Sequence, residues 1–431
     1  MINKLKRLKS NDPWFWVPSL YFAESIPYVT VMIISLVMYK RLGMSNTDIT
    51  IYTSWMYLPW VIKPFWSPFV DIIKTKRWWI LTMQLLIGAS LGGVAFTIPG
   101  QWWLQGSLCF FWLMAFSSAT HDIAADGFYM LGLDHHQQSL FVGIRSTFYR
   151  IATIFGQGFL ITVAGNMEVL TRNIRYSWSL TFYLMAGLFI ALWLYHNWAL
   201  PKPDEDNDKG KISAGALLKE LGRTIVTFFQ KPQVIVGICF ILFYRMPEGL
   251  LAKISTLFLV DAQRNGGMGL SPAEYGLVQG TVGVVGLTLG GILGGIAISR
   301  GGLKKWLWPM VCAITLPDFV YVYLSYALPS SLFIVNVCVF IEQFGYGFGF
   351  SAYMLYLIYY SQGEHKTSHY AICTAFMALS MMLPGLVAGA LQEAVGYRMF
   401  FIIVMISCSM TFIVSACLKI SPEFGKKKKE E

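Results

Sequence analysis

The hydrophobic positions of the chain form long apolar runs that recur from one end to the other. Each run has about 20 residues or more, which is the length that an α-helix needs to cross a bilayer. The pattern predicts an all-α membrane protein with twelve transmembrane helices. The predicted spans are 14–40, 48–70, 77–98, 104–131, 139–165, 177–199, 233–260, 273–299, 304–327, 331–360, 368–395 and 398–419.

A polar stretch between the sixth and seventh runs divides the predicted helices into two sets of six. The short motifs Ser45-x-x-Asp48 and Ser271-x-x-Glu274 follow the first run of each set, and both are typical of helix N-terminal caps. Their equivalent positions favour a parallel repeat of the kind found in transporters. The domain organisation that we expect is a six-helix bundle at 1–200, a central loop at 201–232, a second bundle at 233–420 and a basic tail at 421–431.

Composition and charge support a membrane protein and fix its predicted orientation. Charged residues make up 13% of the chain, against about 25% in soluble domains. Of 33 Lys and Arg residues, 22 fall in one set of predicted loops and 6 in the opposite set. The positive-inside rule therefore places both termini and the central loop in the cytoplasm. The net charge of +10 is thus explained by loops beside a lipid bilayer, and we expect no nucleic-acid partner.

The fourth predicted helix carries two acids in an apolar setting. Asp122 and Asp126 are four residues apart, so they share one helix face. A charge at the bilayer centre costs about 2.5–3.5 kcal/mol on insertion scales, and two nearby carboxylates do not both ionise cheaply. The pair therefore suits a proton carrier, and the alternative is a structural ion pair with the next helix. That helix offers Arg145 and Arg150, of which we expect the deeper Arg150 to face the acids.

The seventh predicted helix carries the charged residues of the second half. Arg245 and Glu248 flank Pro247, which predicts a broken helix whose loosened backbone contacts a ligand. The alternative is an Arg–Glu pair that only satisfies itself. Glu24, before Pro27, is the counterpart in the first half by position. Glu342 precedes a glycine-rich stretch of the tenth helix, and Asp318 in the ninth helix is expected to be more peripheral.

The second predicted helix ends in Lys63-Pro-Phe-Trp-Ser-Pro-Phe-Val-Asp71, followed by a basic loop with Lys74 and Arg77. This arrangement resembles the cytoplasmic gate signature of the major facilitator superfamily, although Ser67-Pro68 replaces the usual glycines. The alternative is a helix end with ordinary interfacial charges. Lys63 either faces inward or extends to the cytoplasmic interface.

Two of these motifs resemble a particular family. Lys63–Asp71 is similar to the K-F-x-W-[SA]-P-x-x-D stretch of the AmpG-type muropeptide permeases, which share a family with acetyl-coenzyme A transporters. Phe116-Ser-Ser-Ala-Thr-His-Asp-Ile-Ala-Ala-Asp126 is similar to their S-A-[ST]-Q-D-I-x-x-D-A stretch, with His121 in place of Gln and Gly127 in place of Ala. The resemblance runs from about residue 20 to 410 and implies a major facilitator fold.

The resemblance implies a monomeric permease of the bacterial inner membrane. It would import N-acetylglucosamine–anhydro-N-acetylmuramic acid peptides with protons, in cell-wall recycling and β-lactamase induction. The residues assigned to proton coupling are Asp122, Asp126, Glu24 and Glu248. Those assigned to the substrate are Arg150, Arg245 and Lys63 for its carboxylates, Tyr28, Trp55 and Tyr149 for its sugar rings, and Glu342. The gating residues are Asp71, Lys74 and Arg77.

Other functions remain open at this point. The motifs indicate the fold and the family more strongly than the substrate. An alternative is therefore a transporter of the same kind that carries another anionic solute, such as an acyl-coenzyme A. A membrane-embedded enzyme would use His121 and the aspartates, and a receptor would bind cell-wall fragments without moving them. The sequence contains no HExxH, P-loop or GxSxG motif, and its seven cysteines form no CxxC. We therefore expect no catalytic activity, no cofactor and no metal site.

Overall fold

The computed structural model describes residues 12–133, 135–202, 214–363, 366–422 and 424–425 of the chain. Within these ranges the chain is helical apart from short turns, and no strand occurs. Ten helical segments of the described part are long and apolar enough to cross a membrane. The all-α class that the hydrophobic pattern predicts is therefore confirmed.

All twelve predicted spans are helical, and several of them differ from a simple single helix. The second is divided into α4 (Asn46–Trp55) and α5 (Leu58–Ile73), each too short to cross a membrane alone. The eleventh and twelfth are joined in α19 (Lys366–Ala416), where Gly396 has φ +75° and turns the backbone. Only glycine adopts this backbone conformation at no steric cost, so Gly396 marks the boundary between the two spans.

The chain forms two compact units, and their residue ranges do not coincide with the N-terminal and C-terminal halves of the sequence. Unit 1 contains residues 1–35 and 62–220, and unit 2 contains 36–61 and 221–431. The segment 36–61 includes most of α3 (Ser35–Arg41) and all of α4, and α4 packs on α19. Gly389 permits this contact, because a Cβ there would lie 2.2 Å from Oγ1 of Thr50.

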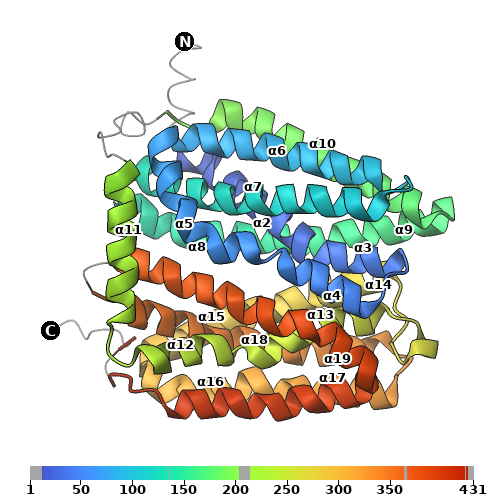
Figure 1. The fold of residues 1–431 in the computed structure, drawn as a ribbon. Coiled ribbons are helices and arrows are strands. Elements are labelled where there is room, and N and C mark those ends of the chain that lie inside the picture. The colour runs from blue at the N-terminus through green and yellow to red at the C-terminus, as the bar shows by residue number, and fades with distance from the viewer. Residues whose placement is uncertain (1–11, 134, 203–213, 364–365, 423, 426–431) are drawn as a thin grey trace. The chain divides into compact units, whose positions relative to one another are not determined.

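The helices of unit 1 pack side by side, with α6 beside both α7 and α10, and α2 beside α8 (Figure 1). Its buried core includes Trp16, Phe128 and Ile80. Its further elements are η1 (Pro13–Phe15), α2 (Val17–Val29), η2 (Thr30–Ile34), α6 (Lys76–Thr97), α7 (Trp103–Gly132), α8 (His135–Ile154), η3 (Phe155–Leu160), α9 (Ile161–Thr171) and α10 (Ile174–Ala199).

Unit 2 contains two helices that approach very closely, α15 (Val284–Gly301) and α18 (Leu332–Ser361). The glycines of the eighth predicted span supply this packing face, as their three- and four-residue spacing predicts. The further elements of unit 2 are α12 (Val234–Phe243), α13 (Met246–Val260), η5 (Gln263–Asn265), α14 (Pro272–Leu277), η6 (Val278–Gly283), α16 (Leu303–Thr315), η7 (Leu316–Asp318) and α17 (Phe319–Ala327).

The predicted central loop contains a helix that the sequence analysis did not anticipate. Residues Ala214–Phe229 form α11, and Phe228 is fully buried in the core of unit 2. Lys231 follows the helix and donates hydrogen bonds to the carbonyl oxygens of Tyr360 and Gln362. The polar residues 203–213 of this loop and residues 426–431 of the predicted tail lie outside the described residues.

Candidate functional site

A cluster of charged side chains in unit 1 surrounds the two acids of α7. Asp122 and Asp126 lie in the second half of this helix, with Asp126 six residues before its end. Their side chains are 21% and 43% exposed, so neither is fully enclosed by the packed helices. The cluster therefore places two partly exposed acids on an otherwise apolar helix.

Lys63 is the partner of the first acid. Its Nζ lies 2.5 Å from Oδ2 of Asp122, and this contact joins α5 to α7. The lysine follows Ile62 and precedes Pro64 within α5, two turns before the gate motif ends at Asp71. Of the two orientations left open for Lys63, the inward one is found.

Arg145 is the partner of the second acid. Its Nη1 lies 3.0 Å from Oδ1 of Asp126, and the hydroxyl of Tyr21 donates to the same oxygen at 3.0 Å. The guanidinium stands over the rings of Tyr21 and Tyr129, 4.7 and 5.1 Å from their centroids. Such stacking orients a guanidinium without neutralising it, so its charge stays directed at the carboxylate.

The expectation that Arg150 faces the aspartate pair is wrong. No described ion pair or hydrogen bond joins Arg150 to either acid, and Arg145 occupies this position instead. The two arginines are five residues apart on α8, so only one of them faces α7. Asp126 lies close to the turn between α7 and α8, and Arg145 is nearer to that turn than Arg150. The role of Arg150 toward a substrate stays a prediction.

Glu24 completes the cluster from α2. It is 9% exposed, its Oε2 has no hydrogen-bond partner among the described residues, and it interacts electrostatically with both aspartates. Tyr28 and Tyr149 lie half-buried in the same unit. Trp55, at the end of α4, belongs to unit 2 and is 45% exposed.

A buried network of hydrogen-bonded side chains beside the cluster was not predicted from the sequence. Nε2 of Gln84 lies 3.1 Å from Nε2 of His121, and Oε1 of Gln84 lies 3.0 Å from Nδ1 of His196. Nε2 of His196 in turn lies 2.9 Å from Oγ of Ser19. The four residues come from α7, α6, α10 and α2, so only the folded structure brings them together. His121 is thus held at Nε2 by a structural network, while its Nδ1 has no hydrogen-bond partner among the described residues.

The predicted gating residues have separate surroundings. The side chain of Asp71 lies outside what the structure describes, and Lys74 is exposed. Arg77 donates to the carbonyl oxygens of Asn197 at 2.5 Å and Leu200 at 3.3 Å. It thereby satisfies carbonyls at the C-terminal end of α10, where a cation also meets the negative end of the helix dipole. The gating assignment stays a prediction.

Unit 2 contains the predicted helix break. Helix α12 ends at Phe243 and α13 begins at Met246, so the break falls at Tyr244 and Arg245. The guanidinium of Arg245 lies over the ring of Phe350 at 4.8 Å and donates to the hydroxyl of Tyr346 at 2.5 Å. The broken helix is confirmed.

The acids of unit 2 also lie together. One carboxylate oxygen from each of Glu248, Asp318 and Glu342 falls within 4.8 Å of the others. Asp318, which was expected to be peripheral, is therefore a member of the group. A sequence signal for this membership was available, because the helix-breaking residue Pro317 directly precedes Asp318. In the structure the short 3₁₀ segment interrupts the helix at this point, as the break at Arg245 interrupts the seventh span.

A second network in unit 2 joins the ends of four helices. Nζ of Lys40 lies 2.8 Å from Oδ2 of Asp261, and Tyr397 donates to the same oxygen at 2.9 Å. Asn46 donates to the hydroxyl of Tyr397 at 2.8 Å and to Oε1 of Gln392 at 2.6 Å. The sequence analysis assigned no role to these residues, because their separations along the chain reach 351 residues.

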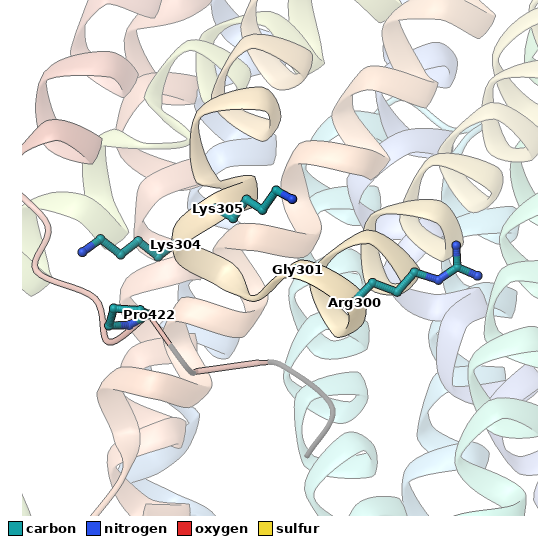
Figure 2. A pocket seen from close by; sticks show the side chains of 5 residues that line it. All are labelled: Arg300, Gly301, Lys304, Lys305 and Pro422. Atoms are coloured by element: carbon teal, nitrogen blue, oxygen red, sulfur yellow. The ribbon is translucent and has the colours of Figure 1, made fainter. Parts of the chain in front are cut away.

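A surface pocket of unit 2 lies at the turn between α15 and α16. Arg300, Gly301, Lys304, Lys305 and Pro422 line it. Figure 2 shows that Lys304 points to the opposite side of the view from Lys305 and Arg300. The pocket fits a basic loop next to a membrane surface.

The family of the chain follows from a sequence comparison. Residues 19–356 match the model of the Major Facilitator Superfamily, which is more than half of the chain. The chain belongs to the Major Facilitator Superfamily. It is a membrane transporter, and its ligand is a small molecule.

Solved structures of the superfamily agree with the fold. A D-xylose–proton symporter matches with a TM-score of 0.67 at 10% identity, over 99% of this chain and 100% of that one. The nucleoside transporter NupG matches with a TM-score of 0.65 at 14% identity, over 94% and 98%. Likeness at this identity concerns the fold alone.

Two similar proteins of the superfamily carry the name that the motifs predict. The anhydromuropeptide permease of Escherichia coli is 24% identical over 348 residues, which cover 80% of this chain and 67% of the relative. A putative transporter AmpG 4 of Rickettsia conorii is 24% identical over 373 residues, covering 84% and 86%. The resemblance to the muropeptide permeases is thereby confirmed.

Proposed function

We propose that the chain imports anhydromuropeptides together with protons, as a monomer in a bacterial cytoplasmic membrane with both termini in the cytoplasm. The observation that carries the proposal is the pairing of the motif residues Lys63 and Asp122, and of Asp126 with Arg145. These residues hold acids and carboxylate-binding cations in one cluster. A peptide-bearing muramic acid offers carboxylates for such cations and sugar rings for aromatic side chains.

Coupling between proton and substrate follows from competition for one cation. Arg145 does not pair fully with Asp126 and with a substrate carboxylate at the same time. Protonation of Asp126 removes the competing charge and makes the guanidinium available to the substrate. Proton binding and anion binding then favour each other, as thermodynamic linkage requires. Lys63 and Asp122 form a second pair of the same kind, and Glu24 supplies a further exchangeable proton.

In unit 2 we assign Arg245 to a carboxylate of the substrate, with Glu248 as a proton-coupling group and Glu342, close to Glu248, as a further substrate contact. Arg150, Tyr28, Trp55 and Tyr149 are further substrate contacts in this proposal. Asp71, Lys74 and Arg77 act as the cytoplasmic gate.

The test is uptake of a labelled anhydromuropeptide into proteoliposomes, with and without an imposed proton gradient. Wild-type protein is expected to accumulate the label only with the gradient. Asp126→Asn resembles the protonated state, so it is expected to bind the label with a weaker pH dependence than wild type and to lose gradient-driven accumulation. Asp48→Asn, which changes an exposed acid at the start of α4, serves as the matched control and keeps both.

The outcomes separate the proposal from its alternatives. Gradient-driven accumulation by Asp126→Asn at the wild-type rate would overturn the coupling assignment. Uptake that coenzyme A esters suppress and muropeptides do not would assign the other anionic cargo. Tight binding without uptake would indicate a receptor, and turnover of the label by detergent-solubilised protein would indicate an enzyme.

A further inference from the structure

Three buried acids converge in unit 2 from three separate helical elements. Glu248 lies in the first turn of α13, Asp318 ends the 3₁₀ segment η7, and Glu342 lies in α18. Their side chains are 8%, 4% and 2% exposed, and one carboxylate oxygen of each lies within 4.8 Å of the others. Buried carboxylates inside a membrane protein are costly and seldom occur without a partner.

The protein supplies few partners to these oxygens. Glu342 accepts hydrogen bonds from Tyr321 at 3.4 Å and from Gln343 at 2.9 Å. Oδ2 of Asp318 has a weak contact with Sγ of Cys408 at 3.8 Å. Glu248 is more than nine-tenths buried, faces the other two acids, and has an Oε2 without any hydrogen-bond partner in the described part of the chain. An unsatisfied buried carboxylate oxygen requires a ligand to compensate for its lost hydration.

The charge of the group also calls for a cation. With all three acids ionised, Arg245, the cation that acts on Glu248 among the described residues, leaves a net negative charge in an apolar surrounding. Shared protons would neutralise it through hydrogen bonds between carboxyl groups. No hydrogen bond among the described residues joins these three acids to one another, although their oxygens converge. This spacing is the arrangement that a bridging ion produces.

We propose that Glu248, Asp318 and Glu342 bind a hard, oxygen-preferring metal cation of the size of Na⁺ or Ca²⁺. Oxygen ligands of Ca²⁺ lie about 2.3–2.6 Å from the ion, so one ion reaches three oxygens that lie within 4.8 Å of one another. Two of the ligands lie at helix interruptions, between α12 and α13 and between α16 and α17. Interrupted helices present backbone carbonyls as further ligands, as in other cation-coupled transporters.

The test measures binding to the purified full-length chain at equilibrium, with Na⁺ and Ca²⁺ as separate probes. Thermal unfolding is followed in choline chloride, NaCl or CaCl₂ at constant ionic strength and pH. Equilibrium dialysis with radioactive Na⁺ or Ca²⁺ gives the stoichiometry. The site's ion is expected to bind once per chain and to raise the unfolding midpoint by about 3 °C or more at saturation.

Substitutions locate the binding to the cluster. Asp318→Asn and Glu342→Gln preserve side-chain shape and are expected to weaken binding of that ion about tenfold or more. Glu274→Gln, at an exposed acid that caps α14, is the matched control and is expected to bind as wild-type does. Size-exclusion chromatography checks that each variant is folded.

Equal unfolding midpoints of the wild-type chain in choline, Na⁺ and Ca²⁺ would overturn the inference. So would binding that both cluster variants retain, or a stability that depends on pH and on no metal ion, which would indicate a protonated cluster instead. The wild-type measurement decides even if a variant fails to fold. Binding is measured without any solute, so its failure leaves the proposed import of muropeptides untouched, whereas a bound metal ion would make Glu248 a metal ligand and leave proton coupling to the acids of unit 1.

Discussion

At the scale of single residues, one carboxylate in unit 1 has two partners that hold it in place. Asp126 accepts a hydrogen bond from Tyr21 and pairs with Arg145, which itself donates to the Tyr21 hydroxyl at 2.9 Å. The three groups form a closed triangle, so a change of charge on one of them alters the other two. The proposed coupling rests on this arrangement.

The first residue-scale prediction compares the two arginines of α8. Arg145→Gln is expected to lower muropeptide affinity about tenfold or more, because a charge-assisted hydrogen bond contributes about 1.5–3 kcal/mol. It is also expected to weaken the pH dependence of binding, since Asp126 then has no cation to release. Arg150→Gln is expected to keep the pH dependence. Binding isotherms at several pH values measure both effects, and the same pH profile in wild-type and Arg145→Gln would contradict the triangle's role.

A second prediction concerns Asp261, which follows the last residue of α13. Burial raises the pKa of Asp261, but hydrogen bonds from Lys40 and Asn265 outweigh it and hold the pKa below the ordinary value of 3.8. A carboxyl group with a lowered pKa stabilises the fold above its ordinary pKa, and this contribution is lost as the pH falls through the lowered value.

The unfolding midpoint of the wild-type chain is therefore expected to fall between pH 5 and about pH 3 by more than that of Asp261→Asn. At neutral pH the wild-type chain is the more stable of the two. Calorimetry or intrinsic fluorescence across this range measures the difference. Parallel curves for the two chains would show that the Lys40–Asp261 pair contributes nothing to stability.

At the scale of helices, glycine determines which helices touch. A Cβ at Gly290 of α15 would lie 2.1 Å from the carbonyl oxygen of Phe344 in α18, and one at Gly347 of α18 would lie 2.2 Å from the carbonyl oxygen of Leu287. The opposing atoms are backbone, so they do not move without moving the helix. Small residues that allow close backbone approach drive association where water is absent.

Gly290→Ala is accordingly expected to destabilise unit 2 by about 1–3 kcal/mol, the usual cost of overpacking. Gly295→Ala in the same helix is the matched control, because nothing lies within 4 Å of the added atom. It is expected to leave stability unchanged or to raise it slightly through better helix propensity. Thermal unfolding of the two variants in the same detergent gives the comparison, and equal midpoints would show that α15 and α18 separate at little cost.

At the scale of the whole molecule, orientation follows from the distribution of Lys and Arg along the chain. Alkaline phosphatase fused after residue 420 is expected to be inactive, because this enzyme requires the periplasm. The same enzyme inserted after Gly43, in the turn after the first span, is expected to be active. Activity of the fusion after residue 420 would contradict the cytoplasmic placement of the C-terminus.

The hydrophobic pattern was sufficient for the helices and for the local features within them. Twelve spans, the caps at Ser45 and Ser271, and the break at Arg245 all depend on residues close together in the chain. In a bilayer each spanning segment must form its own backbone hydrogen bonds. Each span can therefore be recognised in the sequence from its own length and apolar character. Asp122 and Asp126 could be recognised in the same way, because few charged residues occur within an apolar spanning segment.

Partners of these charges were decided only in the tertiary structure. Whether Arg145 or Arg150 meets Asp126 depends on the level at which α8 passes α7, and the membership of Asp318 depends on which helices meet in unit 2. The grouping of residues 36–61 with unit 2 likewise follows from contacts across long separations. The sequence by itself determined which residues are charged inside the membrane. Which of these charges pair cannot be read from the sequence, because the distance between two side chains on different helices depends on how the helices pack and not on the separation of the residues along the chain.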